Sequence, residues 1–246
     1  MNDFARLRPH QLQEAIAANT PVVLPIGVLE YHGQHLPAGV DLLAVTEVLD
    51  RLGDQIIILP PFAYGAASHA VAGPEGTGTL HIDASAILPM AEALFTALLK
   101  AGFRNICGVV HHQTEGFDQG MPTDLAFRLG ARNAIMRFLE ATRGTGWWGD
   151  GNMQDYYARQ ADGEDPFNWI RIHPLFPKGA AYPFDHAGKG ETSLMQALAP
   201  STVEMARAGD GGHWYTADAD QASPELGERG VQIALAHLRK ALRLSH

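Results

Sequence analysis

The chain has 246 residues, of which 46% are hydrophobic and 18% charged, and its formal net charge is −9. This composition is typical of a globular protein with a sizeable core, and the acidic balance argues against a nucleic-acid or anionic-membrane partner. The single cysteine, Cys107, excludes an internal disulfide and a cysteine zinc cluster and fits a reducing compartment. No signal-peptide pattern or apolar run of membrane-spanning length is present, so we expect a soluble, cytoplasmic protein.

The first part of the chain predicts a βαβ unit. A helix is expected at 9–18, followed by an apolar strand at 21–29, a helix at 42–52 and a second strand at 55–59. Strand, helix and strand in this order imply a parallel sheet with a right-handed crossover. A near-continuous apolar strand also indicates a sheet that is covered on both faces.

The middle of the chain alternates a long loop with regular elements. Residues 62–82 are rich in Gly, Ala and Thr, so they either line a site or move. Asp83 is expected to cap a helix that Gly102 ends, and a third strand follows at 105–110. A further helix is predicted at 124–142 from the spacing of its apolar residues.

The last hundred residues begin irregularly and end in helices. We interpret 144–183 as an excursion with a short helix near 153–159 that contributes substrate contacts, because no continuous periodicity supports a second core. Apolar helices follow at 194–200 and 224–244. We therefore expect a single α/β domain over 1–246.

Residues able to bind a metal gather at three places where strands end or helices begin. Histidine and carboxylate side chains bind divalent ions without any cysteine ligand. Two such ions that share one carboxylate can polarise a carbonyl and activate a water molecule. A Glu-X-His pair in a loop is otherwise often only a solvated surface pair. The three groups are Glu30, His32 and Asp41; His111 and His112; and Asp185, His186 and Glu191.

These residues also carry a family resemblance. The stretch Leu24-Pro-Ile-Gly-Val-Leu-Glu-Tyr-His-Gly-Gln-His-Leu-Pro, with Asp41 eleven residues after its Glu, resembles the signature of the creatininase (creatinine amidohydrolase) family. The resemblance continues through Tyr64-Gly, Gly76-Thr and Lys100-Ala-Gly-Phe-Arg, and returns at His186-Ala-Gly-Lys-Gly-Glu-Thr-Ser193. It covers most of the chain apart from about 117–180. It implies a three-layer α/β/α sandwich around a mainly parallel sheet, a metal-dependent hydrolase and a homohexamer.

Carried over residue by residue, the resemblance implies two divalent ions, Zn, Mn or Fe, with Asp41 bridging them. It implies that His186 moves protons beside the substrate, although His186 could instead cap the following helix. We predict His186 and Glu191 as catalytic residues, and His35 could orient a ligand. The implied metal ligands are Glu30, His32, Asp41, His112 and Glu191.

The central motif departs from the family. Where the family usually reads Asn-Gly-His-Gly-Gly-Asn, this chain reads Val110-His-His-Gln-Thr-Glu115, and Thr114 stands where creatininase itself has a glutamate. Creatinine is therefore a doubtful substrate, and Glu191 becomes the favoured fifth ligand. The larger polar side chains could contact the substrate or merely hold the loop. With Asp185, we predict His111, Gln113 and Glu115 as substrate-binding residues.

Trp147 and Trp148, flanked by glycines, form the other unusual feature. Paired indoles in a glycine-rich loop are typical of a lid over a ligand, so we predict substrate binding here as well. The alternative is an oligomer contact or ordinary packing. Trp169 and Trp214 receive no such role, because nothing in the neighbouring sequence converges on them.

Three functions remain open at this stage. The favoured one is a metal-dependent hydrolase that opens a small polar cyclic substrate at a cyclic amide C–N bond. The second is a hydrolase that opens a cyclic keto-polyol, an inosose-type ring, at a C–C bond. The third is a metal-binding protein without catalysis. We found no phosphate-binding glycine motif, nucleophile elbow or dinucleotide fingerprint.

Overall fold

The computed structural model describes residues 3–161 and 165–244 as an α/β fold. Four parallel strands form one sheet in the order β2-β1-β3-β4. The strands are β1 (Val22–Ile26), β2 (Ile57–Ile58), β3 (Ile106–Val110) and β4 (Ile170–Pro174). The α-helices are α1 (Pro9–Ala17), α2 (Val40–Asp50), α3 (Ala84–Ala101), α4 (Pro122–Arg143), α5 (Tyr156–Ala161), α6 (Lys189–Leu198) and α7 (Pro224–Ala241).

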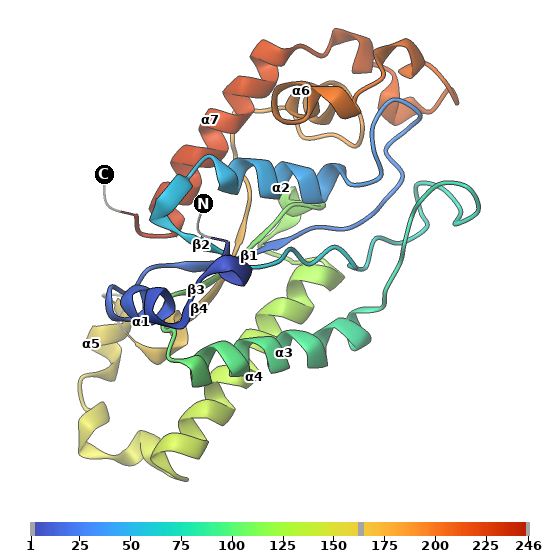
Figure 1. Ribbon diagram of the computed structural model, residues 1–246. Coiled ribbons are helices and arrows are strands. Elements are labelled where there is room, and N and C mark those ends of the chain that lie inside the picture. The colour runs from blue at the N-terminus through green and yellow to red at the C-terminus, as the bar shows by residue number, and fades with distance from the viewer. Residues whose placement is uncertain (1–2, 162–164, 245–246) are drawn as a thin grey trace.

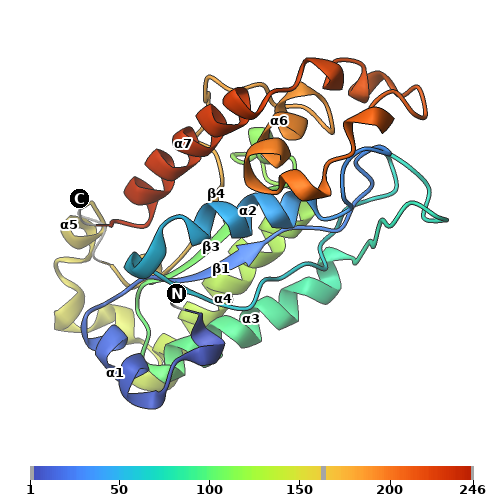
Figure 2. The same cartoon turned by 45° about the horizontal axis from the view of Figure 1, so that its top comes forward.

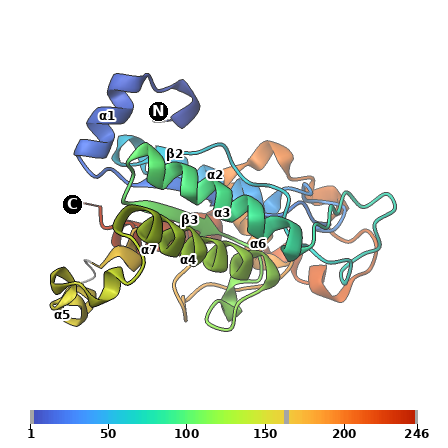
Figure 3. The same cartoon turned by 90° about the horizontal axis from the view of Figure 1, so that it is seen from below.

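Helices cover both faces of the sheet, as Figures 1 and 2 show. Helices α3 and α4 pack side by side on one face, and α2, α6 and α7 pack on the other (Figure 3). Side chains of β1 and β3 point alternately into the two cores, with Leu24 on the α3–α4 side and Val23 and Cys107 on the opposite side. The predicted three-layer α/β/α sandwich around a parallel sheet is confirmed.

The irregular excursion predicted at 144–183 contains a strand that the sequence pattern did not indicate. β4 pairs in parallel with β3, and Ile106 and Val110 stand opposite Ile170 and Pro174. The strand lies at the edge of the sheet, and only Ile170 of its five residues is fully buried. Its half-buried Ile-Arg-Ile-His-Pro sequence therefore lacks the apolar run that identified β1 and β3.

Helix α3 is long and strongly apolar. Among the described helices it alone passes a test for a candidate membrane span, with a mean hydropathy of 1.4 over 18 residues. Its side chains Ile87, Phe95 and Leu99 are buried in the core against α4 and the sheet. It ends at Gly102, which adopts a left-handed conformation (φ 110°) as predicted. One face of α3 packs on the core, and 28% of the helix is buried.

Candidate metal centre

The loop that follows β1 and the turn that follows β3 bring a first group of ligand atoms together. His112 Nδ1 lies 3.5 Å from Glu30 Oε2 and 3.7 Å from Asp41 Oδ2. All three residues are buried, and one ligand atom of each lies within 4.8 Å of the other two. Ligand atoms placed tetrahedrally about 2.0–2.2 Å from an ion are ~3.4 Å apart. The first group therefore has the spacing of a metal site.

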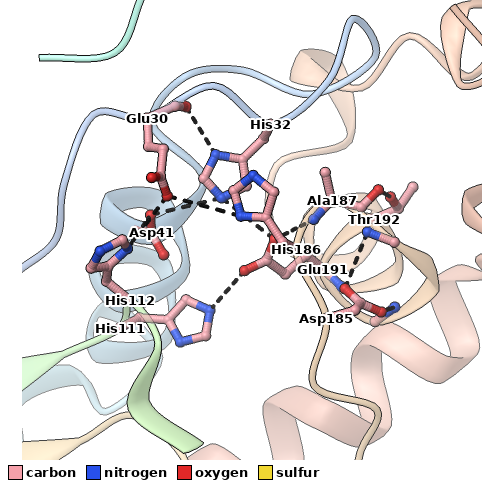
Figure 4. A network of polar contacts seen from close by, with 12 residues as sticks. Glu30, His32, Asp41, His111, His112, Asp185, His186, Ala187, Glu191 and Thr192 are labelled. Atoms are coloured by element: carbon pink, nitrogen blue, oxygen red, sulfur yellow. Dashed lines mark hydrogen bonds and ion pairs between the residues drawn. The ribbon is translucent and has the colours of Figure 1, made fainter. Parts of the chain in front are cut away.

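A second group shares one atom with the first. His32 Nε2 lies 3.7 Å from Asp41 Oδ2 and 3.4 Å from Glu191 Oε2. His32 Nδ1 donates to the backbone carbonyl of Glu30 at 2.9 Å, which leaves Nε2 of the neutral ring as a free acceptor. The same oxygen, Asp41 Oδ2, faces both groups, so the geometry fits two neighbouring cations bridged by this carboxylate (Figure 4).

A close backbone approach places Asp41 at the first turn of α2. A Cβ built on Gly27, just after β1, would lie 2.6 Å from the N and Cα atoms of Leu42. Any larger residue would push the start of α2 away from the strand end. The glycine in Pro-Ile-Gly-Val thus holds Asp41 next to the loop that carries Glu30 and His32.

The pKa values of the first group are shifted in the directions expected where buried carboxylates favour a nearby positive charge. Burial raises the pKa of Glu30 to about 7, although neighbouring His112 acts against this shift. For Asp41 burial is outweighed by the contact with His112 and the charge of His32, and the pKa falls to about 2. Burial lowers the pKa of His112, but Asp41 and Glu30 raise it to about 9. A divalent cation between these groups would satisfy the same demand more strongly.

Helix α6 contributes Glu191, and Asp185 fixes the start of that helix. The Asp185 carboxylate accepts hydrogen bonds from the backbone N–H groups of Gly188, Gly190 and Glu191. Burial and the nearby Glu191 raise the pKa of Asp185 to about 6. Asp185 also borders a cavity in front of the ligand atoms, but its carboxylate is engaged with the backbone of α6. The alternative that His186 caps this helix is wrong, because Asp185 makes these contacts.

His186 is oriented by the loop that carries the first ligands. Its Nε2 lies 2.8 Å from the backbone carbonyl of Tyr31, so Nε2 carries the proton of the neutral ring. Nδ1 then faces Glu30 Oε2 at 3.9 Å, and the ring lies 4.3 Å from that of His32. Burial and His32 lower the pKa of His186. Glu30, His32 and His186 also form a third group with metal-ligand spacing.

Two further histidines lie next to α6, and His111 also borders the cavity in front of the ligands, as predicted for a substrate-binding residue. His111 Nε2 is 3.6 Å from Glu191 Oε1, and neither of its buried ring nitrogens has a hydrogen-bond partner among the described residues. His35 Nε2 pairs with the hydroxyl of Thr192 at 2.9 Å, next to Glu191 in α6. His35 therefore ties the loop after β1 to the helix that carries Glu191 and does not bind a ligand atom itself.

The turn after β3 is conformationally strained. His112 and Gln113 have positive φ angles, 149° and 49°, which cost about 1–3 kcal/mol for residues other than glycine. The family's usual motif has glycine where this chain has Gln113, so a larger side chain occupies a glycine conformation. Gln113 and Glu115 are exposed and border the cavity in front of the ligands, while Thr114 is buried.

A cavity of about 590 Å³ opens onto the ligand groups, and its walls come from distant parts of the chain. Asp41, His112 and Glu191 form its polar floor, next to His186. Its apolar wall includes side chains that sequence reasoning did not assign, among them Phe176, Tyr182, Phe184, Trp214 and Tyr215. No motif marks these residues, and aromatic side chains are equally common in cores, so only the tertiary fold identifies them.

Trp147 and Trp148 are not part of this cavity, and the prediction that they cover it requires correction. They follow the C-terminal end of α4, whereas the N-terminal end of that helix lies near His112. The 22 residues of α4 span about 33 Å, and Figures 1 and 3 place α5 and its neighbours at the opposite end of the molecule from α6. Trp147 is buried, and Trp148 lies 4.1 Å from the Tyr156 ring. In this chain the two indoles pack on each other and on α5.

Comparison with known proteins assigns this chain to a family of hydrolases. The family model described as creatininase, creatinine amidohydrolase, matches residues 5–242. A creatinine amidohydrolase from Pseudomonas putida is 28% identical over 199 residues, which cover 79% of this chain and 70% of that protein. The chain belongs to the creatininase family.

Solved structures agree on the fold. A manganese form of creatininase has a TM-score of 0.71 and 22% identity, covering 98% of this chain and 97% of that one. A mutant creatininase complexed with creatine also has a TM-score of 0.71, with 21% identity and the same coverage. A Zn-Zn form has a TM-score of 0.67 with 22% identity, covering 97% and 96%.

Proposed function

We propose that this protein is a divalent-metal-dependent hydrolase that opens a small cyclic amide at its C–N bond. The observation that carries the proposal is the pair of three-residue groups that share Asp41 Oδ2 beside His186. Family membership adds that relatives named creatininase occur in Mn and Zn-Zn forms. The cavity volume of about 590 Å³ suits a small organic ligand.

The donor set fits two divalent ions. His32 Nε2 and Asp41 Oδ2 are buried and have no hydrogen-bond partner among the described residues, which is costly unless a cation binds them. Glu30, Asp41 and Glu191 place three carboxyl groups in one buried region, with histidine nitrogens between them. Oxygen and imidazole ligands without sulfur suit Zn, Mn or Fe.

The chain's own residues would divide the work as follows. Glu30, Asp41 and His112 would hold one ion, and His32, Asp41 and Glu191 the other. Bound there, the ions would polarise the scissile carbonyl and lower the pKa of the attacking water. His186 Nε2 stays hydrogen-bonded to the Tyr31 carbonyl, so Nδ1 would accept a proton and pass it to the leaving nitrogen. Glu191 would be a ligand of the second ion and, as a residue that borders the cavity, would also lie beside the substrate.

Metal analysis followed by substrate screening tests this function. Purified protein is expected to contain divalent metal and to add one water to members of a panel of cyclic amides, creatinine included, as read by mass. A parallel panel of cyclic keto-polyols tests the C–C alternative, which the comparisons do not support. Turnover of keto-polyols alone would contradict the proposal, and bound metal without turnover of either panel would favour a metal-binding protein.

Two further expectations belong to this proposal and need separate measurement. A homohexamer is expected from family membership, and native mass spectrometry reads it directly. A cytoplasmic location is tested by fractionating cells that express the protein.

A further inference from the structure

One wall of the cavity is a cluster of three aromatic rings between β4 and α6. Phe176 and Tyr182 stack with ring centroids 5.3 Å apart and an interplanar angle of 11°. Phe184 meets Phe176 edge-on at 5.6 Å. Phe176 and Tyr182 are buried, but Phe184 keeps 38% of its surface exposed. The inner two rings therefore support Phe184, which presents a free face at the cavity.

A second aromatic group comes from the segment between α6 and α7. His213 and Tyr215 stack at 4.9 Å with an angle of 7°, and Trp214 meets Tyr215 edge-on at 5.8 Å. Tyr215 in turn meets His186 edge-on at 5.2 Å. This group is thus anchored to the residue beside the ligand atoms. Trp214 itself is 87% exposed although it borders the cavity.

The exposed rings of Phe184 and Trp214 make the wall of the cavity chemically different from its floor. Its floor holds carboxylates and imidazoles, and its wall offers the apolar faces of Phe184 and Trp214. Large aromatic faces left in water are unfavourable, and covering one with a flat apolar group is worth about a kcal/mol beyond the area buried. Hydroxyl-rich rings gain little from such a wall, because their polar groups would lose water without finding partners.

We propose that Trp214 and Phe184 form the specificity wall of the cavity and that the substrate is a cyclic amide bearing a flat apolar substituent. This inference rests on the proposed cyclic amide hydrolysis. The amide ring lies over the ligand groups, and the substituent lies against the indole of Trp214. Both side chains act in binding the substituent, so they affect KM for substituted rings and leave the ring chemistry unchanged.

Kinetics with a matched pair of compounds test the wall. Hydantoin and 5-benzylhydantoin share the cyclic amide and differ only in the flat apolar group. With the metal-loaded enzyme we expect KM for 5-benzylhydantoin to rise about tenfold in Trp214→Ala, equivalent to about 1.4 kcal/mol. Trp214→Phe should retain most of the preference, and Phe184→Ala should lose part of it. KM for hydantoin should stay within about twofold in all three variants.

Tyr157→Ala is the matched control, because Tyr157 is 75% exposed on α5 and does not border the cavity. It should leave the KM of both compounds unchanged. An equal KM for the two compounds in the wild-type enzyme, or an equal rise for both in Trp214→Ala, would contradict the proposal that these rings bind the apolar substituent. A change of oligomeric state in Trp214→Ala would also overturn it, because the indole would then be a subunit contact.

Calorimetric binding of the same two compounds separates this inference from the proposed function. If neither compound is hydrolysed, the hydrolase assignment for such rings fails. The binding constants still test whether the aromatic wall binds the apolar substituent. Tighter binding of 5-benzylhydantoin that is lost in Trp214→Ala supports it. Equal binding of both compounds, or no binding of either, contradicts it.

Discussion

The two ends of the sheet differ in how their unusual side chains are partnered. At the carboxyl end, His32 Nε2, Asp41 Oδ2 and both nitrogens of His111 are buried without hydrogen-bond partners among the described residues. At the other end, the conspicuous rings contact one another, with Trp147 and Trp148 centroids 5.6 Å apart. Unsatisfied buried polar atoms cost stability and call for a ligand, whereas packed rings stabilise the fold. The sequence predicted a functional role for both regions. Whether their side chains have contact partners in the fold distinguishes the ligand site from ordinary packing.

The largest expected contrast is in turnover. His112→Ala removes a ligand of the first group and should lower the rate by on the order of 10³-fold or more, because the buried carboxylates lose their partner. Trp148→Ala should leave the rate within about twofold. Steady-state kinetics on any accepted cyclic amide compare the two variants, with circular dichroism as the check on folding. Comparable losses in both variants would remove the distinction between the two ends.

The next contrast is in stability. Trp147 is buried with Met153 and Tyr156, so Trp147→Ala should lower the free energy of unfolding by about 3 kcal/mol. Its rate per folded molecule should not change. Urea denaturation of wild type and variant measures the difference. A stable Trp147→Ala protein with a raised KM would instead restore the lid interpretation.

The pKa values of histidines in the two regions sharpen the comparison further. His111 and His112, beside carboxylates, have raised pKa values, whereas burial, with Arg171 and His237 nearby, lowers the pKa of His173 in β4 to about 4. Between pH 6.5 and 4 the unfolded His173 binds more protons than the folded one, so its contribution to stability is full above pH 6.5 and lost as the pH falls.

The His173→Leu variant isolates that contribution. Between pH 7 and pH 4, wild type should lose about 3 kcal/mol more unfolding free energy than His173→Leu does. Denaturation at each pH gives the two profiles, and subtracting them cancels the titration of the metal ligands. Parallel profiles would show that His173 does not titrate in this window.

The smallest expected effect concerns strain in the turn after β3. Gln113→Gly should raise the unfolding free energy by up to about 1 kcal/mol, because glycine adopts a φ of 49° without steric cost. Asn19→Gly is the matched control, because Asn19 also has a positive φ but lies outside the site. It measures how much stability glycine adds by removing backbone strain alone. A destabilised Gln113→Gly protein would mean that contacts of the glutamine side chain outweigh the strain.

The residues that the sequence predicted best are those whose signal is local. β1, β3, α3 and α7 have apolar periodicity along the chain, and Glu30, His32 and Asp41 lie within one motif at the end of a buried strand. β4 was missed because its edge position leaves polar residues in the pattern. Trp214 was missed and Trp148 misassigned for one reason: the sequence does not show which surface a ring faces. Only the close approach of separate segments reveals that.

Metal stoichiometry tests the central claim most directly, since the account depends on two ions sharing Asp41. Elemental analysis and native mass spectrometry should find two divalent ions per wild-type chain. Asp41→Asn weakens both groups at once, so it should retain fewer than one ion per chain, while His35→Ala, which removes no ligand, should retain two. Asp41→Asn protein that still holds two ions per chain would contradict the account.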